Sequence, residues 1–207
     1  MAWQESRQWL QGDKSETYYQ RALDSAKEKP VRDAQKERVI RPWDMPWEMA
    51  PQGILKHMIN SEMNTRMETV DLYMQVIPPG SKSGKHRHLA EECLYVLEGI
   101  GYDVHRDCDV EITDTYHWTP QDEERRYEWR AGDVIYVPPN TIHQHFNSSK
   151  EKPVRIISAT NRIYKFSGLD DLEQIENAPE YVKGMVLNAA KVEALVRKAR
   201  VAPRVQT

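Results

Sequence analysis

The sequence is poor in cysteine, has no long apolar run and carries no surplus of positive charge. Cys93 and Cys108 are its only cysteines, so a multi-disulfide scaffold is excluded and a reducing, cytoplasmic setting is expected. No apolar run is long enough to cross a bilayer, and residues 1–14 lack the apolar core of a secretory signal. The net charge of -3 argues against a nucleic-acid partner, because no basic excess is available to neutralise phosphates.

The central part of the chain, residues 66–165, has the pattern of short strands. METVDLYMQVIPPG alternates with a period of two, which puts Val70, Leu72, Met74 and Val76 on one face and Asp71, Tyr73 and Gln75 on the other. Further strand-like segments follow, separated by Gly, Pro and Asn, and they suggest an all-β sandwich or barrel. We expect Met74 and Val76 to line its interior, and residues 103–126 to form a long hairpin or loop over one end.

Both ends of the chain differ from this centre. Residues 1–40 are charged and predict polar helices interrupted near Gly12 and Pro30. Residues 41–65 begin with RPWDMPWEMAPQG, whose prolines predict an extended arm. The arm's tryptophans would close the barrel mouth or, as we expect, bury themselves in a homodimer or larger homo-oligomer. Residues 166–207 return to helical spacing, with an apolar stripe at Val186, Ala190, Val192, Leu195 and Val196.

Two histidines in SGKHRHLAEECLYVLEG suggest a metal site. On a strand His86 and His88 point to the same face, whereas on a helix they would diverge. Glu92 would lie about 13 Å beyond His88 on a continuous strand, so it joins the site only if residues 89–91 turn back and the following segment returns as an antiparallel strand. His143, in GDVIYVPPNTIHQHFN, offers a fourth ligand. Without these partners, the histidine pair would equally fit an exposed basic patch.

These segments resemble the cupin superfamily. Its first signature, G(x)5HxH(x)3E(x)6G, is matched at every spacing by Gly80, His86, His88, Glu92 and Gly99. Its second, G(x)5PxG(x)2H(x)3N, is matched by Gly132, Pro138, His143 and Asn147. Asn140 replaces the middle glycine and also tolerates left-handed backbone. The resemblance implies an all-β double-stranded β-helix, the jelly-roll or cupin barrel, with helical N- and C-terminal extensions. It also implies that His86, His88, Glu92 and His143 bind one metal ion.

The chemistry of the donors indicates which metal. Three imidazoles and one carboxylate, without thiolate, suit octahedral Fe(II), Mn(II), Ni(II) or Co(II) and leave two positions for water or substrate. Fe(II) is the expected ion, and Zn(II) is an alternative that in structural sites more often uses cysteine.

The resulting hypothesis is a metal-dependent dioxygenase acting with O2 on a small aromatic or oxo/hydroxy acid. The lead-in is loosely similar to gentisate-type cupins, while the four-ligand set resembles oxalate-metabolising, acireductone-type and quercetinase-type cupins. The alternatives are a non-oxidative isomerase, lyase or decarboxylase, and a non-catalytic cupin that binds a small molecule.

Several further side chains are candidates for the site. His145 lies on the strand face of His143 and is either a proton-handling group or a buried histidine bonded to a neighbour. Tyr95 and Tyr102, with Tyr136, are candidates for a hydroxyl in the cavity, although strand tyrosines mostly pack. The remaining histidines are expected to be surface or structural residues: His57, His105 and His117.

Overall fold

The computed structural model describes residues 11–113, 115–169 and 172–201. The chain divides into two compact units, residues 1–36 and 37–207. In the first unit, helix α2 (Tyr18–Ala34) buries none of its residues. The expected break at Pro30 is wrong, since the helix continues past it. Arg32 bonds Glu28 and the carbonyl of Ser25, which ties the last turns together around the missing proline N–H. A helix expected before Gly12 falls largely outside the described residues.

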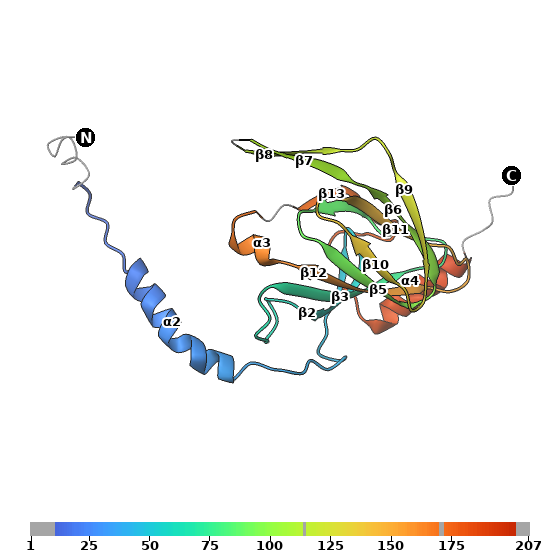
Figure 1. The fold of residues 1–207 in the computed structure, drawn as a ribbon. Coiled ribbons are helices and arrows are strands. Elements are labelled where there is room, and N and C mark those ends of the chain that lie inside the picture. Colours follow the sequence, from blue (N-terminus) through green and yellow to red (C-terminus); the bar gives the residue numbers. More distant parts are fainter. Residues whose placement is uncertain (1–10, 114, 170–171, 202–207) are drawn as a thin grey trace. The chain divides into compact units, whose positions relative to one another are not determined.

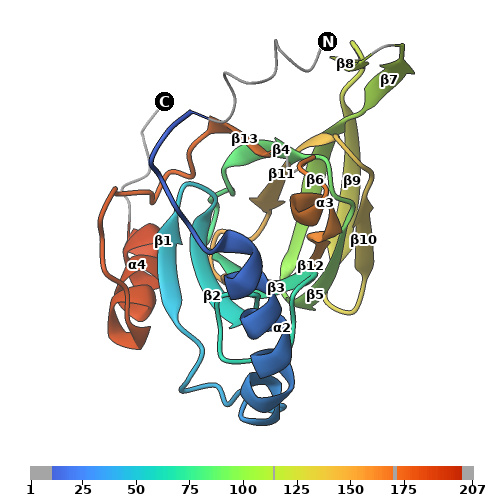
Figure 2. The same ribbon diagram turned by 90° about the vertical axis from the view of Figure 1, so that its left-hand side faces the viewer.

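The second unit is built of two large antiparallel sheets and one two-stranded ribbon, and Figures 1 and 2 show their arrangement. In spatial order the first holds β1 (Trp47–Ala50), β2 (Gly53–Ile59), β3 (Val70–Ile77), β12 (Val154–Asn161), β5 (Glu92–Glu98) and β10 (Val134–Val137). The second holds β13 (Leu172–Glu176), β4 (Lys85–His88), β11 (Ile142–Asn147), β6 (Ile100–Arg106) and β9 (Arg125–Arg130). This all-β architecture is the one that the sequence predicts.

The first sheet begins earlier in the chain than residue 66. Residues 41–65 do not form a free arm, because β1 and β2 extend the sheet and Ile54 pairs with Val76. The prolines lie before and after β1 rather than inside it, so they delimit the strand without interrupting it. Trp47 is half-buried against the core, and Trp43 is 80% exposed.

The apolar face of β3 points the opposite way from expectation. Met74 and Val76 do not line the interior; they pack on the outside of the sheet with the segment that ends in helix α4 (Ala189–Val201). This outer core consists of Met49, Ile54, Val76, Leu187 and Val192, with Met74, Leu195 and Val196 against it. A C-terminal segment covers this face, so the polar face with Tyr73 is free to turn inward. A second cluster of buried apolar residues is separate from this outer core. It consists of Ile77, Leu94, Val96, Trp129, Ile135, Val137, Val154 and Ile156.

The rest of the chain departs from the predicted helices in one place. Residues 166–207 are not wholly helical, because β13 pairs with β4, Gln174 lying opposite His86. The short helix α3 (Ile163–Phe166) precedes β13, and Val186 and Ala190 are exposed. Among the described residues, no helix is both long enough and apolar enough to cross a membrane.

The predicted hairpin is present but starts later. It is the ribbon of β7 (Cys108–Ile112) and β8 (Tyr116–Pro120), whereas residues 103–106 belong to β6 of the barrel. The guanidinium of Arg87 on β4 lies 3.0 Å from the ring centre of Trp118 on β8. This contact joins the ribbon to the strand that carries the histidine pair.

Candidate metal centre

Strand β4 presents His86 and His88 to the barrel interior, where both are buried. Between them Arg87 points outward and bonds Glu173 of β13. After residues 89–91 the chain does turn back, but it crosses into the other sheet. Glu92 begins β5, which pairs with β10 and β12. The returning strand does not lie beside β4, because β11 and β13 occupy both edges of β4.

Strand β11 brings in the fourth residue. His143 lies directly opposite His86 in the antiparallel pair of β11 and β4. The turn before β11 needs one left-handed residue, and Asn140 takes it with φ of 64°, as the substitution in the signature predicts. The backbone N–H of Asn140 donates to the carbonyl of His88 at 2.9 Å, so the turn is fixed to the strand of the histidine pair.

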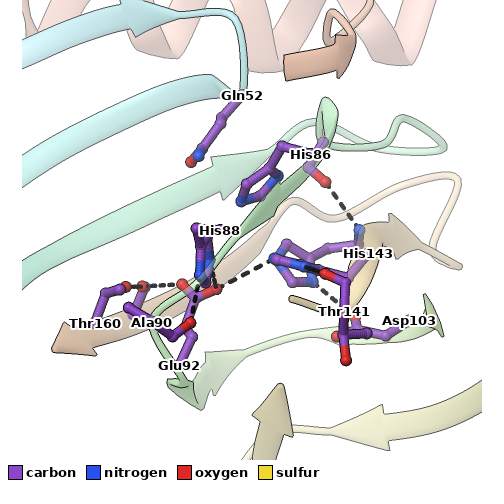
Figure 3. Close-up of polar contacts among 12 residues, drawn as sticks. Gln52, His86, His88, Ala90, Glu92, Asp103, Thr141, His143 and Thr160 are labelled. Carbon is purple, nitrogen blue, oxygen red and sulfur yellow. Dashed lines mark hydrogen bonds and ion pairs between the residues drawn. The ribbon is translucent and has the colours of Figure 1, made fainter. Parts of the chain in front are cut away.

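The four side chains converge on one point (Figure 3). One ligand atom from each of His86, His88, Glu92 and His143 lies within 4.8 Å of the others, and all four residues are buried. Nδ1 of each histidine faces a backbone carbonyl: Ala90 at 2.6 Å for His88, Thr141 at 2.9 Å for His143 and Gly84 at 3.5 Å for His86. A carbonyl only accepts, so Nδ1 carries the proton and Nε2 offers its lone pair to the cluster.

Nε2 of His86 has no hydrogen-bond partner among the described residues, and the contact of His143 Nε2 with Glu92 does not have hydrogen-bond geometry. Leaving buried polar atoms unsatisfied is costly, and a bound cation would satisfy both. Burial, followed by the neighbouring His143, lowers the pKa of His86 well below its usual value. Burial also lowers the pKa of His143. Both imidazoles are therefore neutral, which is the form that binds a metal.

Glu92 supplies a charged oxygen. Its Oε2 lies 3.3 Å from Nε2 of His88 and 3.2 Å from Nε2 of His143. Its Oε1 accepts hydrogen bonds from the hydroxyls of Tyr73 and Ser158. Burial raises the pKa of Glu92, but the bonds with His143 and His88 outweigh it and hold that pKa well below the usual value. The buried, anionic His-His-Glu-His cluster fits a divalent metal ion.

Residues 26–172 match the family model described as auxin binding protein. The chain belongs to this cupin-type family. It is 23% identical over 96 residues to auxin-binding protein T85 of Nicotiana tabacum, covering 46% of the chain and 48% of that protein. It is 30% identical over 99 residues to the uncharacterized protein MJ1618 of Methanocaldococcus jannaschii, covering 47% and 65%. The matched region thus spans about half the length of the tobacco relative.

Solved structures agree on the fold. Vicilin from tomato (Solanum lycopersicum) superposes with a TM-score of 0.51 at 12% identity, over 67% of this chain and 36% of that chain. An identity this low shows the fold alone. The cupin resemblance and the all-β barrel that it implies are confirmed.

Of the remaining candidates, His145 lies beside the His-His-Glu-His cluster and is not one of its four residues. Its Nδ1 is 2.9 Å from Oδ1 of Asp103, a buried carboxylate that also accepts from Trp129 and lies 3.3 Å from Nε2 of His105. His145 is thus buried and paired with a neighbour, and its role as a proton-handling group stays a prediction. His105 was expected at the surface or in a structural role and is buried. His57 lies 2.6 Å from Glu48, and His117 is exposed.

The predicted tyrosines do not reach the cluster. Tyr95 lies on the outer face of β5 and is 45% exposed, Tyr102 stacks on Phe146 outside β6, and Tyr136 is exposed. A period of two puts every second strand residue outside, and these three occupy the outer positions. Tyr73 takes the inner position instead. The alternation of β3 was visible in the sequence, but its polar face, which carries Tyr73, was expected to point outward.

A cavity of about 410 Å³ leads to the cluster. His88 and Tyr73 contribute to its wall, together with Gln52, Leu55, Arg162 and Leu172. Most of the lining residues are polar or charged, and Leu55 and Leu172 are among the few that add apolar surface, so the cavity suits a small molecule with both polar and apolar parts.

Proposed function

We propose that His86, His88, Glu92 and His143 hold one divalent transition-metal ion, Fe(II) before Mn(II), Ni(II), Co(II) or Zn(II). The observation that carries this proposal is the orientation of the three imidazoles. Each has Nδ1 on a carbonyl, and Nε2 of His88 and of His143 lies against the carboxylate of Glu92. All donors are nitrogen or oxygen. Cys93 is exposed, and Cys108 directs its thiol to the carbonyl of Asn140, so neither contributes sulfur.

The function that this site supports best is the binding of a small organic acid. A bound metal supplies a Lewis-acidic position for an oxygen atom of the ligand. Leu55 and Leu172 offer apolar contacts to the ligand body, and Gln52 offers hydrogen bonds. Relatives of this chain are named for binding auxin, and auxins are small organic acids.

A second candidate, an iron-dependent dioxygenase, is favoured by the donor set itself. Three imidazoles and one carboxylate are typical of open octahedral sites, which have room for a substrate and for O2. Turnover without O2 would instead favour the isomerase, lyase or decarboxylase hypothesis.

The first experiment is metal analysis of freshly purified full-length protein. We expect roughly one ion per chain, and loss of that ion in His88→Ala and in His143→Ala. His57→Ala is the matched control, because His57 pairs with Glu48 outside the cluster. Unchanged metal content in His88→Ala and His143→Ala would contradict the proposed centre.

The second experiment separates binding from catalysis. Organic acids should bind the metal-loaded protein and lose affinity after chelation, as followed by calorimetry. Oxygen uptake that depends on the added acid would support the dioxygenase. Binding without oxygen consumption or product formation would leave the binding function alone.

A homodimer remains part of this proposal. Trp43 is exposed, as are Val134 and Tyr136 on the outer face of the edge strand β10. Trp47 packs within its own barrel, so it does not support the dimer interface in which the sequence placed both tryptophans. Sedimentation velocity tests the proposal, and a monomer at micromolar concentration would contradict it.

A further inference from the structure

One charged side chain of the cavity has no part in the metal centre described above. Arg162 follows the last residue of β12 and precedes α3, and it lines the same cavity as His88. Its backbone N–H donates to the carbonyl of Thr69 at 2.6 Å, so its position between the end of β12 and the start of β3 is fixed. Among the described residues of the lining, Asp71 is the other one with a full charge.

The two charges are unequally placed. Nε of Arg162 lies 3.5 Å from Oδ2 of Asp71, and the Arg162 side chain is 19% exposed against 36% for Asp71. The cation is therefore more deeply placed than its carboxylate partner.

A divalent ion with Glu92 leaves one uncompensated positive charge at the inner end of the cavity. Arg162 adds a second positive charge, which Asp71 offsets from the more exposed side. A negatively charged ligand is the partner that this arrangement favours, since opposite charges attract most strongly where water is partly excluded. Arginine offers a planar fork of five N–H donors that matches a carboxylate.

We propose that Arg162 determines ligand specificity, by binding the anionic group of a small organic anion in the cavity beside His88. This inference rests on the proposed binding function and adds the residue that selects charge. Asp71 orients the guanidinium when no ligand is bound. The apolar side chains of Leu55 and Leu172 then face the uncharged body of the ligand.

The test compares an acid with its neutral amide. Indole-3-acetate and indole-3-acetamide are titrated into the metal-loaded full-length protein, and the metal content of each sample is measured. Because a hydrogen bond to a charged group is involved, Arg162→Gln should weaken the acid by about 10- to 100-fold and the amide by less than about threefold. Arg155→Gln is the matched control: Arg155 lies on β12, the strand that Arg162 follows, and pairs with Glu98, but it does not line the cavity.

A second variant separates ligand selection from a structural role. Asp71→Asn should bind the acid as tightly as the wild type or more tightly, because it removes the competing carboxylate. If Arg162 served only to pair with Asp71, both variants would weaken the acid and the amide alike, and the inference would be overturned. Unchanged acid affinity in Arg162→Gln with full metal content would overturn the inference alone. The inference would also be overturned if the metal-loaded wild type bound neither probe. The metal centre itself is tested separately, by the metal content of His88→Ala.

Discussion

The hydroxyl of Tyr73 on β3 lies 3.2 Å from Oε1 of Glu92 on β5. Ser158 of β12 donates to the same oxygen. With Oε1 held in this way, Oε2 is the atom turned to His88 and His143. Glu92 is thus oriented as a ligand through one oxygen by residues that would not touch the metal themselves.

We therefore predict that Tyr73→Phe lowers metal affinity. Partners that orient a ligand typically account for roughly 10- to 100-fold in affinity, and the Phe variant keeps the ring while losing the donor. A competition titration against a chelator measures the effect. Tyr95→Phe, on the outer face of β5, is the control, and equal affinities in both variants would show that the bond to Glu92 has no orienting role.

Asp103 makes the stability of the metal-free protein depend on pH. Burial raises the pKa of Asp103, but His145, His105 and Trp129 outweigh it and lower that pKa. The stabilisation from this carboxylate is therefore present above its unfolded pKa of about 3.9 and is lost as the pH falls further. For His145, burial lowers the pKa, but Asp103 outweighs it and raises that pKa. Its contribution is complete below about pH 6.5 and is lost as the pH rises through the raised value.

Asp103→Asn should consequently destabilise the protein most between about pH 4 and 6.5, where we expect it to reduce the free energy of unfolding by about 1–3 kcal/mol. The difference from wild type should shrink on either side of that window. Urea unfolding in the presence of a chelator provides the measurement. Asp109→Asn changes an exposed carboxylate of β7 and should show no such window; a pH-independent loss in Asp103→Asn would argue against the ion pair.

Asn140 is predicted to matter through its backbone. At φ of 64° a residue with a β-carbon and no compensating side-chain bonds costs about 1–2 kcal/mol, so Asn140→Ala should lower the melting temperature. Asn140→Gly, the residue of the cupin signature, should stay close to wild type. A melting temperature for the glycine variant as low as that for alanine would show that the contact between the Asn140 side chain and Arg87 dominates instead.

The ribbon of β7 and β8 should be held by Trp118. Removing its contact with Arg87 in Trp118→Ala costs about 0.5–2 kcal/mol, which should increase hydrogen exchange in residues 108–120 while metal content stays the same. Val110→Ala changes an exposed side chain of the same ribbon and provides the comparison. Unaltered exchange in Trp118→Ala would mean that other contacts, such as the bond of Thr141 to Asp107, suffice.

The spacing of residues within short motifs was enough to predict much of the site. The spacing of His86 and His88 requires a strand for chelation, and the signatures add Glu92 and His143. Asn140 could be assigned a left-handed turn because few other residues tolerate one. These features are local, and short-range geometry determines which neighbours share a face.

Contacts between distant segments could not be predicted in the same way. Alternation divides β3 into two faces, but which face turns inward depends on α4, more than a hundred residues later in the sequence. For the same reason Tyr73 was missed as the residue that orients Glu92, and Tyr95 and Tyr102 were assigned to a cavity that they do not reach. Strand-like character in residues 172–176 became evident only through pairing with β4.

The sequence by itself therefore determined the all-β character from alternation and the shared face of His86 and His88 from strand spacing, while its resemblance to the cupin signatures identified the barrel, Glu92 and His143. The tertiary structure decided what surrounds them: the partners of Glu92, the burial of His105 and His145 around Asp103, and the position of Arg162 in the cavity. Packing of one sheet against another and against a covering helix is a collective property, and no short segment carries it alone.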